Sequence, residues 1–436
     1  MTLLYRRLTY GIFIIIFLIL APVVVLYTAG YRYNFTKGRV QKTGILTISS
    51  NPRGAGINLN GQLVKQTTPA KIEKILPGDY EIQLTLPGYH SWQKKLPIYE
   101  NSTAFAEKIN LWLLATSSPL TAIKAETTFV SSDQKKLALL TNKKELWVFD
   151  QATEKNIFLG QLNNYTEVKI NDWSADANLI LMAVKSGAVK DFYVFNYQNG
   201  SRQKLVNKNF TSVKWDKEKS TILYGLNSQG LWTIDISAQT TKLIDRLAAT
   251  AFYLNGSKLY YLNGRELRLK TLGDGAPGQL IENLPDADFT VKDQKKNRLF
   301  LLNETAHSLA IIDLDRQNKT ILTSADKFSW LNDNLMLFYN DWEIFIYDLN
   351  KPEPELITRW GEKISSVLWH PQGKHIIFAS ENKIKIIELD NRELRNIIDL
   401  DSGAQAQEML LDNRSQNLYY AGSYNGADGI FKLRLQ

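Results

Sequence analysis

The chain divides into three regions that differ in how apolar and polar residues follow one another. Residues 11–30 (GIFIIIFLILAPVVVLYTAG) form a run of twenty residues without a charge. Residues 44–113 contain short segments in which apolar and polar residues alternate, which is typical of half-buried strands. Residues 114–436 repeat a pattern of short strands at intervals of roughly forty residues. These patterns predict a membrane helix, a small β-domain and a repeat domain.

The apolar run at 11–30 predicts a transmembrane helix. At about 1.5 Å of rise per residue, twenty residues cover the roughly 30 Å hydrocarbon core of a bilayer. We interpret the run as an uncleaved signal anchor, with residues 1–10 as a cytoplasmic N-terminal tail and residues 31–43 as a juxtamembrane linker. The alternative is a signal peptide cut near Thr28-Ala29-Gly30, although the apolar part of such peptides is usually only about 7–15 residues long.

The charges beside the apolar run leave its orientation open. Arg6 and Arg7 precede the run, whereas four basic residues follow it within residues 31–43. A count of flanking positive charges slightly favours a cytoplasmic C-terminal side. A short basic tail before a first hydrophobic segment is, however, also typical of signal anchors that export the rest of the chain.

The alternation in residues 44–113 is clearest between two Leu-Pro-Gly turns, at 76–78 and 86–88. Between these turns, Tyr80, Ile82 and Leu84 alternate with polar residues, which predicts a half-buried strand. Earlier in the same region, Asn60-Gly61 is the strongest short signal for a β-hairpin. We therefore predict a small antiparallel β-domain over residues 44–113.

This region resembles the PEGA family of small β-domains. The similarity rests on five motifs: Gly44-Ile45-Leu46-Thr47-Ile48-Ser49, Pro52-Arg53-Gly54-Ala55, Thr68-Pro69, Leu76-Pro77-Gly78-Asp79-Tyr80 and Gly88-Tyr89-His90-Ser91-Trp92. Two positions depart from the family pattern, because Gln66 replaces the usual glycine before Thr-Pro and Asn60 replaces the usual Asp of the hairpin. The resemblance implies a β-sandwich on the outer side of bacterial or archaeal membranes that acts as a surface or adhesive module. It therefore favours an exported C-terminal side.

A five-residue strand motif recurs through residues 114–436 at intervals of 35–46 residues. It has apolar residues at its first and third positions and usually ends in Asp or an equivalent residue. Its copies are LWVFD at 146–150, FYVFN at 192–196, LWTID at 231–235, LAIID at 309–313, IFIYD at 344–348 and IKIIE at 384–388, with weaker copies at 267–271 and 430–434. Such a period, with short strands throughout, predicts a β-propeller.

Each repeat offers four candidate strands, which in the second repeat are Val168–Asn171, Leu179–Val184, Asp191–Phe195 and Arg202–Val206. We count eight repeats, and the last one has only three clear strands. We therefore predict that residues 119–124 supply its fourth strand and close the ring, which would protect both edges. Seven blades is the alternative if one weak repeat is an irregular insertion.

The turn before the second strand of several repeats resembles the W-S-P-D-G-K turn of TolB-like and WD-repeat propellers. It is WSAD at 173–176 and WHPQGK at 369–374. The predicted fold class is therefore mainly β. It combines an N-terminal transmembrane helix, a PEGA-like β-sandwich at 44–113, and an eight-bladed or alternatively seven-bladed β-propeller at 114–436.

The net charge of +8 is confined to the N-terminal part of the chain. Residues 1–113 hold 13 basic and 5 acidic residues, so the repeat region is neutral overall. A nucleic-acid-binding protein would more often carry a basic stripe on its main domain, and we expect no nucleic-acid partner. We expect an anionic lipid surface or cell-wall polymer beside residues 31–113.

The sequence offers no catalytic, cofactor-binding or metal-binding motif. Cysteine is absent, which excludes cysteine nucleophiles and thiolate metal sites. His370 and His375 flank one turn, but two imidazoles without an adjacent third ligand do not define a metal site. We therefore predict no cofactor, no metal and no catalytic residue.

Five aromatic residues are candidates for ligand contact. In the PEGA-like region, Tyr89 and Trp92 could stack on a carbohydrate, or could instead close the small core. In the repeat region, Trp173, Trp215 and Trp369 occupy corresponding turns, where they could line a ligand face or pack between blades.

These features predict a membrane-anchored binding or adhesion protein of the cell surface. Its C-terminal domains would be extracytoplasmic, and its propeller would engage a polysaccharide, another polymer or a protein of the cell envelope. We predict that it is not an enzyme. A carbohydrate-active enzyme, either a glycosidase or a lyase, is one alternative, and a scaffold of an envelope assembly is another. A cluster of carboxylates with raised pKa values at the centre of the propeller would favour the enzyme.

Overall fold

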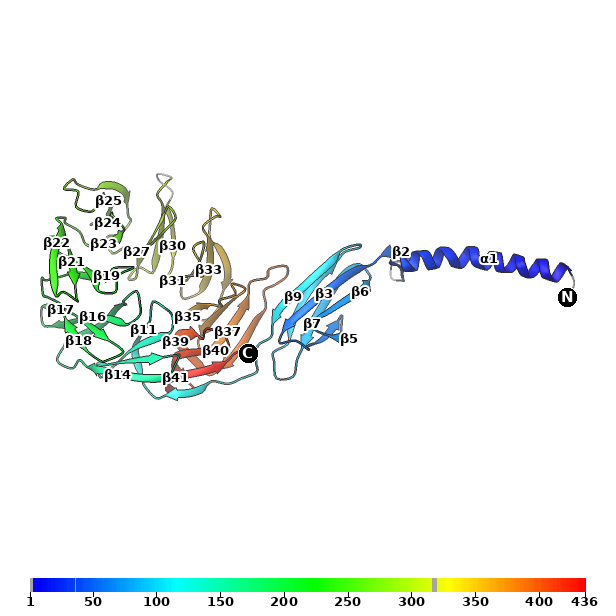
Figure 1. Cartoon of the computed structure of the whole chain (residues 1–436), viewed down its shortest axis with the longest axis horizontal. Coiled ribbons are helices and arrows are strands. Elements are labelled where there is room, and N and C mark those ends of the chain that lie inside the picture. Colours follow the sequence, from blue (N-terminus) through cyan, green and yellow to red (C-terminus); the bar gives the residue numbers. More distant parts are fainter. Residues whose placement is uncertain (1–2, 36, 316–319) are drawn as a thin grey trace. The chain divides into compact units, whose positions relative to one another are not determined.

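The computed structural model of the chain describes residues 3–35, 37–315 and 320–436 (Figure 1). These residues fall into two compact units. The first lies within Met1–Leu114 and also includes Asp390–Ile398 and Gln436, whereas the second comprises Ala115–Leu389 and Asp399–Leu435. The division at residue 114 coincides with the start of the predicted repeat region.

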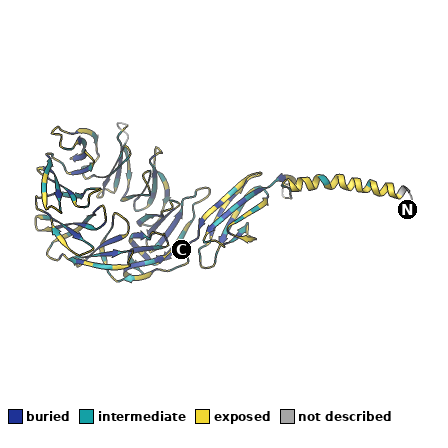
Figure 2. Ribbon diagram, in the orientation of Figure 1, coloured by how far each residue is buried: buried dark blue, intermediate teal, exposed yellow. Residues whose placement is uncertain are grey.

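The first unit begins with the helix α1 (Leu3–Thr28), which contains most of the predicted apolar run. The helix is longer than predicted because it starts within the expected N-terminal tail, where leucines favour a helix. Its segment Tyr5–Thr28 is long and apolar enough to cross a membrane. None of the most apolar part of that segment is buried against the described residues, as Figure 2 shows by its exposed colouring. A membrane anchor and a signal sequence both fit this helix.

A short antiparallel hairpin follows the helix, where the sequence predicted only a linker. It is formed by β1 (Tyr31–Asn34) and β2 (Arg39–Lys42). The guanidinium of Arg32 lies 3.6 Å from the centroid of the Tyr27 ring and donates a hydrogen bond to the Tyr27 carbonyl oxygen at 2.8 Å. The last turn of the helix is therefore joined to the hairpin by a cation–π contact and a hydrogen bond.

The rest of the first unit contains a three-stranded sheet in the order β6-β3-β9 and a four-stranded sheet in the order β5-β4-β7-β8. One expectation was wrong, because β3 and β9 are parallel. The chain reaches β9 from the other sheet, so no tight turn forces these two strands to run in opposite directions. The strands are β3 (Gly44–Asn51), β4 (Gly56–Leu59), β5 (Gln62–Thr67), β6 (Ala70–Ile75), β7 (Gly78–Thr85), β8 (Trp92–Ile98) and β9 (Thr103–Asn110).

The predicted alternation and hairpin are both confirmed. In β7, Ile82 and Leu84 are fully buried in the core of the unit, whereas Glu81 between the turns is exposed. Asn60 and Gly61 connect β4 to β5 with φ angles of +49° and +78°. A tight hairpin turn needs positive φ at both central residues, which Asn-Gly adopts at little cost.

The second unit contains, among the residues that the structure describes, eight four-stranded antiparallel sheets. The first four are β11 (Ala125–Val130), β12 (Lys136–Thr141), β13 (Glu145–Asp150) and β14 (Lys155–Gln161); β15 (Glu167–Trp173), β16 (Leu179–Ser186), β17 (Val189–Asn196) and β18 (Arg202–Lys204); β19 (Ser212–Trp215), β20 (Ile222–Asn227), β21 (Gly230–Asp235) and β22 (Thr240–Asp245); and β23 (Ala251–Asn255), β24 (Lys258–Asn263), β25 (Glu266–Thr271) and β26 (Gln279–Asn283). The strands predicted for the second repeat correspond to β15–β18.

The other four sheets follow in chain order, except that the last one combines strands from both ends of the region. They are β27 (Thr290–Lys295), β28 (Arg298–Asn303), β29 (Ser308–Asp313) and β30 (Thr320–Ser324); β31 (Lys327–Trp330), β32 (Leu335–Tyr339), β33 (Glu343–Asp348) and β34 (Glu355–Arg359); β35 (Ile364–Trp369), β36 (His375–Ser380), β37 (Lys383–Glu388) and β38 (Ile397–Ser402); and β10 (Ser118–Thr121), β41 (Ala427–Arg434), β40 (Asn417–Tyr424) and β39 (Ala404–Leu411).

The second strand of each sheet is apolar on both faces because it lies between two neighbouring sheets. In β16, Ile180 and Met182 belong to the core shared with the preceding sheet, whereas Leu181 and Ala183 belong to the core shared with the following sheet. A strand that is buried on both faces reads as a continuous apolar run. The sequence LILMAV within β16 therefore follows from its place between two blades.

The predicted closure by an N-terminal strand is confirmed. β10 pairs with β41 in an antiparallel register, so the last sheet is completed by residues that precede the first sheet in sequence. The first and last sheets also share a core, in which Leu137 and Phe149 pack with Tyr419 and Ile430. The ring is thus closed and both of its edges are covered.

A glycine and a buried carboxylate hold β10 in place. A Cβ atom at Gly429 would lie 2.0 Å from the carbonyl oxygen of Thr121, so only glycine allows this close approach of β41 to β10. Just before β10, the backbone N–H of Ser117 donates to Oδ2 of Asp401 at 2.8 Å, and Asp401 is buried. The closing strand is therefore fixed by backbone pairing and by this hydrogen bond.

Candidate functional site

The structure places four of the five predicted ligand-contact aromatics in the packed interior. Trp92 is 4% exposed, Trp173 2%, Trp215 7% and Trp369 6%, whereas Tyr89 is partly buried against the core of the first unit. The buried indole rings offer no free face on which a ligand could stack. The expectation that they line a ligand face is therefore corrected, and Tyr89 alone keeps a partly accessible ring.

The three tryptophans of the second unit are buried because each one ends the first strand of a sheet, at the boundary with its neighbour. Trp173 packs with Leu146 and Phe195, and its indole N–H donates to the carbonyl oxygen of Phe129 in the preceding sheet at 3.3 Å. A large aromatic side chain at this position fills the wedge between two blades. The corresponding turns were recognised in the sequence, but their role is packing.

The histidine pair also lies in the interior. His370 and His375 are both buried, and their ring centroids are 5.9 Å apart. Burial lowers the pKa of His370 to about 4, which keeps its imidazole neutral at physiological pH. Within the described ranges no group of three metal-ligating side chains is found at this turn or elsewhere.

A network of interacting polar groups lies on the first strands of several sheets and in turns beside them. First strands of neighbouring sheets contact one another, as β15 does with β19 and β23 with β27. In a propeller the first strands surround the central axis. We name a polar group on and beside these strands the axial cluster. It consists of Asp172, Lys214, Tyr253, Lys292 and Asp293 on first strands, Lys217 just after β19, and Glu304 just after the second strand β28.

Lys214 lies at the centre of the axial cluster and connects three first strands. It projects from β19, and its Nζ donates to the carbonyl oxygens of Phe252 on β23, at 3.0 Å, and of Val291 on β27, at 3.3 Å. Burial, together with the positive charge of Lys292, lowers the pKa of Lys214 to about 8. Lys214 as a residue is half-buried.

A second set of contacts in the axial cluster joins Lys217, Tyr253 and Asp293. The Lys217 ammonium lies 2.6 Å from Oδ1 of Asp293, and the Tyr253 hydroxyl donates to the same oxygen at 3.0 Å. Burial and the neighbouring carboxylate raise the pKa of Tyr253. The phenol therefore stays protonated and acts as a hydrogen-bond donor to the carboxylate.

The remaining charged residues of the axial cluster, Lys292 and Glu304, interact with charges on other sheets. Lys292 lies 2.6 Å from Glu304, and its charge lowers the pKa of that carboxyl group, with smaller contributions from Lys169 on β15 and Lys327 on β31. Lys327 also forms an ion pair with Glu408 on β39, although a complete sheet lies between their two sheets in chain order. Charges from separate sheets thus converge on one region.

Asp172 is the member of the axial cluster whose carboxyl group has a raised pKa. Burial raises its pKa, while a hydrogen bond from the Trp173 backbone N–H at 2.8 Å and the charges of Lys214 and Lys292 act in the opposite direction. The charges that act on Asp172 are therefore cationic. A glycosidase instead places a second carboxylate opposite the first one.

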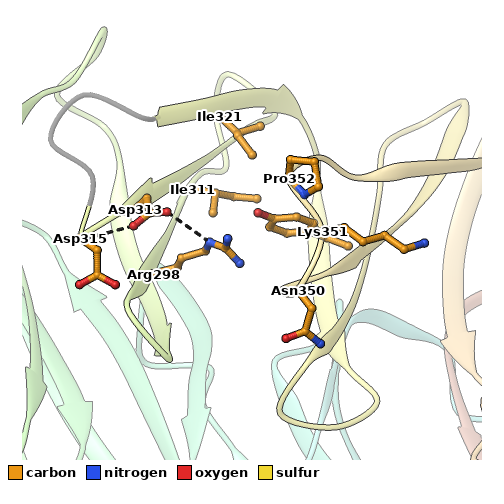
Figure 3. Close-up of a pocket in the computed structure, with 9 residues that line it drawn as sticks. Arg298, Ile311, Asp313, Asp315, Ile321, Asn350, Lys351 and Pro352 are labelled. Carbon is orange, nitrogen blue, oxygen red and sulfur yellow. Dashed lines mark hydrogen bonds and ion pairs between the residues drawn. The ribbon is translucent and has the colours of Figure 1, made fainter.

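A cavity of about 390 Å³ lies apart from the axial cluster, between the sheets β27–β30 and β31–β34 (Figure 3). Its arginine is already engaged, because Arg298 donates to the Leu349 carbonyl oxygen at 2.5 Å and its Nε lies 3.9 Å from Asp313. Its positive and negative groups partly compensate each other, so no single ligand chemistry is favoured. The lining residues are Arg298, Ile311, Asp313, Asp315, Ile321, Tyr347, Asn350, Lys351 and Pro352.

Sequence reasoning missed the axial cluster, although a signal was present. The dipeptide Val-Lys recurs on the first strands of three repeats, at 168–169, 213–214 and 291–292. Lysine is uncommon in strands, so its presence on three first strands indicates a polar environment there. The three lysines do not share one position of the repeat, because Lys169 lies four residues before Trp173 and Lys214 one residue before Trp215. The recurring five-residue motif lies on the third strand of each repeat, so it gives no information about the first strands, where these lysines lie.

Comparisons with known proteins agree with the two units. Residues 43–110 match the PEGA domain model, so the first unit contains a PEGA domain. The second unit is similar to the solved structure of the C-terminal WD40 domain of Sif2, with a TM-score of 0.52 and 13% identity over 73% of this chain and 98% of that one. At this identity the likeness shows the propeller fold alone.

Other comparisons add no function. The crystal structure of Sqt1 from Saccharomyces cerevisiae has a TM-score of 0.48 and 8% identity, and it covers 74% of this chain and 98% of that one. A comparison with curated proteins finds no match. The chain thus comprises an apolar helix, a PEGA domain and a β-propeller.

Proposed function

We propose that this chain is a membrane-anchored binding protein whose PEGA domain and propeller lie outside the cytoplasm. In this proposal α1 is an uncleaved single-pass anchor, and the propeller engages a polymer or a protein of the cell envelope. One observation carries the proposal. The helix segment Tyr5–Thr28 is long and apolar enough to cross a membrane, and residues 43–110, which follow it, match the PEGA domain model. PEGA domains favour an extracellular location. An apolar helix directly before the domain is typical of signal anchors, which supports the same location for the domains that follow it.

The basic character of residues 31–113 supports a second part of the proposal. Two of its lysines, Lys65 and Lys108, are exposed and form no salt bridge within the described residues. Exposed positive charge that follows a membrane helix is attracted to anionic headgroups or wall polymers within a screening length of about 10 Å at 0.1 M salt. We propose that this part of the chain rests against such a surface.

We also propose binding rather than catalysis for the propeller. Asp172 lies among lysines, and Glu304 has a lowered pKa, so the axial cluster does not resemble the acid and base pair of a glycosidase. A lysine such as Lys214, which forms no salt bridge with a described carboxylate, is better suited to hold a ligand than to protonate a leaving group.

The topology is tested by protease treatment of intact cells that express the full chain with a C-terminal tag. The expected result is loss of the tag without lysis, while a cytoplasmic marker stays intact. A tag that is lost only after lysis would contradict the proposed orientation. In parallel, the full chain in non-ionic detergent is mixed with isolated envelope polymer, and saturable co-sedimentation is expected.

A further inference from the structure

The axial cluster holds an ammonium group that has no carboxylate partner. Among the residues that the structure describes, no carboxylate forms a salt bridge with Lys214, whose recorded partners are two backbone carbonyl oxygens. By contrast, Lys217 and Lys292 each have a carboxylate at 2.6 Å. Asp172 and Glu304 act on Lys214 only from beyond salt-bridge distance. A desolvated cation without a carboxylate in direct contact is unfavourable, and a bound anion would supply that contact.

The geometry of Lys214 leaves one donor for a ligand. A lysine ammonium carries three N–H groups. Two of them are accounted for by the carbonyl oxygens of Phe252 and Val291, which hold the amine on one side. Among the described residues no acceptor is recorded for the third N–H, which can therefore donate to an oxygen atom of a ligand.

A second cation lies near the same place. Lys292 exerts the largest charge effect on Lys214, although the two side chains come from β19 and β27. Two ammonium groups that repel each other are both stabilised by an anion placed between them. Lys169 and Lys327 act on the same region from other strands, and Lys169 forms no salt bridge with a described carboxylate.

We propose that the axial cluster binds an anionic oxygen group between Lys214 and Lys292, so that the ligand of the propeller is an anionic molecule. This inference rests on the proposed function, because it assigns a ligand class to the propeller as a binding module. Phosphate is the fitting chemistry, since lysine is a common phosphate ligand that acts as a point charge. The phosphate group can belong to a free ion or to a phosphate-bearing polymer.

The test uses the full chain in non-ionic detergent at pH 7 and low ionic strength, with inorganic phosphate and long-chain polyphosphate as separate probes. The variants are Lys214→Met, which removes the charge and keeps most of the volume, and Lys214→Arg, which keeps the charge. The matched control is Lys242→Met on β22, which is an exposed lysine on the outer strand of the same sheet. Thermal unfolding of each variant checks that the fold is retained.

The expected result is saturable binding that Lys214→Met weakens at least tenfold, whereas Lys242→Met changes it less than twofold and Lys214→Arg retains most of it. Equal affinity for both probes, counted per phosphate, assigns the site to a free ion, and much tighter binding of polyphosphate assigns it to a polymer. The proposal is overturned if neither probe binds, or if Lys242→Met weakens binding as much as Lys214→Met. Should Lys214→Met not fold, Lys292→Gln replaces it with the same expectation.

Binding to isolated envelope polymer separates this inference from the proposed function. If the wild-type chain and Lys214→Met bind the polymer equally well, the binding function stands and the axial anion site is overturned. If phosphate binds through Lys214 but no envelope polymer binds, the anion site stands and the proposed function fails.

Discussion

The first and second strands of the propeller sheets carry different kinds of residue, although they lie side by side. The second strands, such as β16 and β28, are apolar on both faces, and their side chains divide between two neighbouring cores. The first strands carry lysines and carboxylates that converge on the axis. The comparison teaches that this fold places apolar packing and polar clusters on different strands of the same repeat.

The separation follows from the position of each strand. A second strand is covered by another sheet on each face, so any polar side chain there would be desolvated. A first strand borders the axis, where water and ligands can reach it. Substitutions should therefore reduce stability in the second strands and the closing strand, and reduce ligand binding in the first strands.

The largest effect is expected from loss of the closing strand. Replacing residues 117–123 with a Gly/Ser linker of the same length removes the β10–β41 pairing and the Ser117–Asp401 hydrogen bond. The free energy of unfolding of the propeller should fall by about 4 kcal/mol or more, because an edge and part of a core become exposed. Chemical denaturation measures the loss, and light scattering should detect oligomers.

The control for this replacement is a Gly/Ser substitution of equal length in the connection between β25 and β26, where the residues are largely exposed. It should change the stability by less than about 1 kcal/mol. An unchanged midpoint and a monomeric product after loss of β10 would contradict closure by this strand.

A smaller loss is expected from Leu181→Ala on β16. Leu181 is fully buried between two sheets, and truncation of a buried leucine costs about 2–5 kcal/mol. Lys214→Met on the neighbouring first strand should change stability by less than about 1 kcal/mol, because it removes a poorly solvated charge. Similar losses of stability in the two variants would contradict the expected difference between first and second strands in their contribution to stability.

Gly429→Ala should destabilise the propeller by about 1–3 kcal/mol, because the new methyl group meets the Thr121 carbonyl oxygen and pushes β10 away from β41. Gly426→Ala is not a clean control, since Gly426 has a φ of +84° that strains alanine. Gly275→Ala is suitable, because nothing lies within 4 Å of its added Cβ atom and its φ is not positive. Equal stability of the Gly429→Ala and Gly275→Ala variants would show that β10 tolerates the displacement.

The sequence was sufficient to predict features that depend on local pattern. The period-two alternation, the hairpin at Asn60-Gly61 and the four strands of the second repeat are encoded within a few residues, and the structure confirms them. The closing strand could also be predicted, because the repeat count left one sheet with three strands. What the sequence could not give was the parallel pair β3 and β9, since strand direction depends on how the chain crosses between two sheets.

The candidate site was largely beyond the sequence because it depends on contacts between repeats. Lys214 meets Phe252 and Val291, which lie 38 and 77 residues further along the chain. The same limit explains the tryptophans: the turn pattern locates Trp173, but its burial depends on the neighbouring sheet. A pattern within one repeat therefore predicts the strands of that repeat. The burial of Trp173 and the contacts of the axial cluster depend on neighbouring repeats and follow only from the assembled ring.

The smallest expected effect concerns the pH dependence of anion binding, and it isolates Lys214 from the rest of the axial cluster. Its pKa is lowered to about 8 by burial and by Lys292 and Lys217, and Asp172 and Glu304 act in the opposite direction. The charged form binds the anion, so affinity should be full below pH 8 and should fall as the pH rises through that value. At pH 9 roughly one-tenth of the free protein keeps this charge, which predicts about tenfold weaker binding than at pH 7.

Sulfate is the appropriate probe for this prediction, because its own charge is constant between pH 6.5 and pH 9. The full chain should lose affinity over that interval, and Lys242→Met should lose it in parallel. Lys214→Arg should bind with a nearly flat profile, because a guanidinium stays protonated throughout the range. A wild-type profile that is equally flat would show that the amine of Lys214 does not contact the anion, and the first strands would then share their binding role among the other lysines.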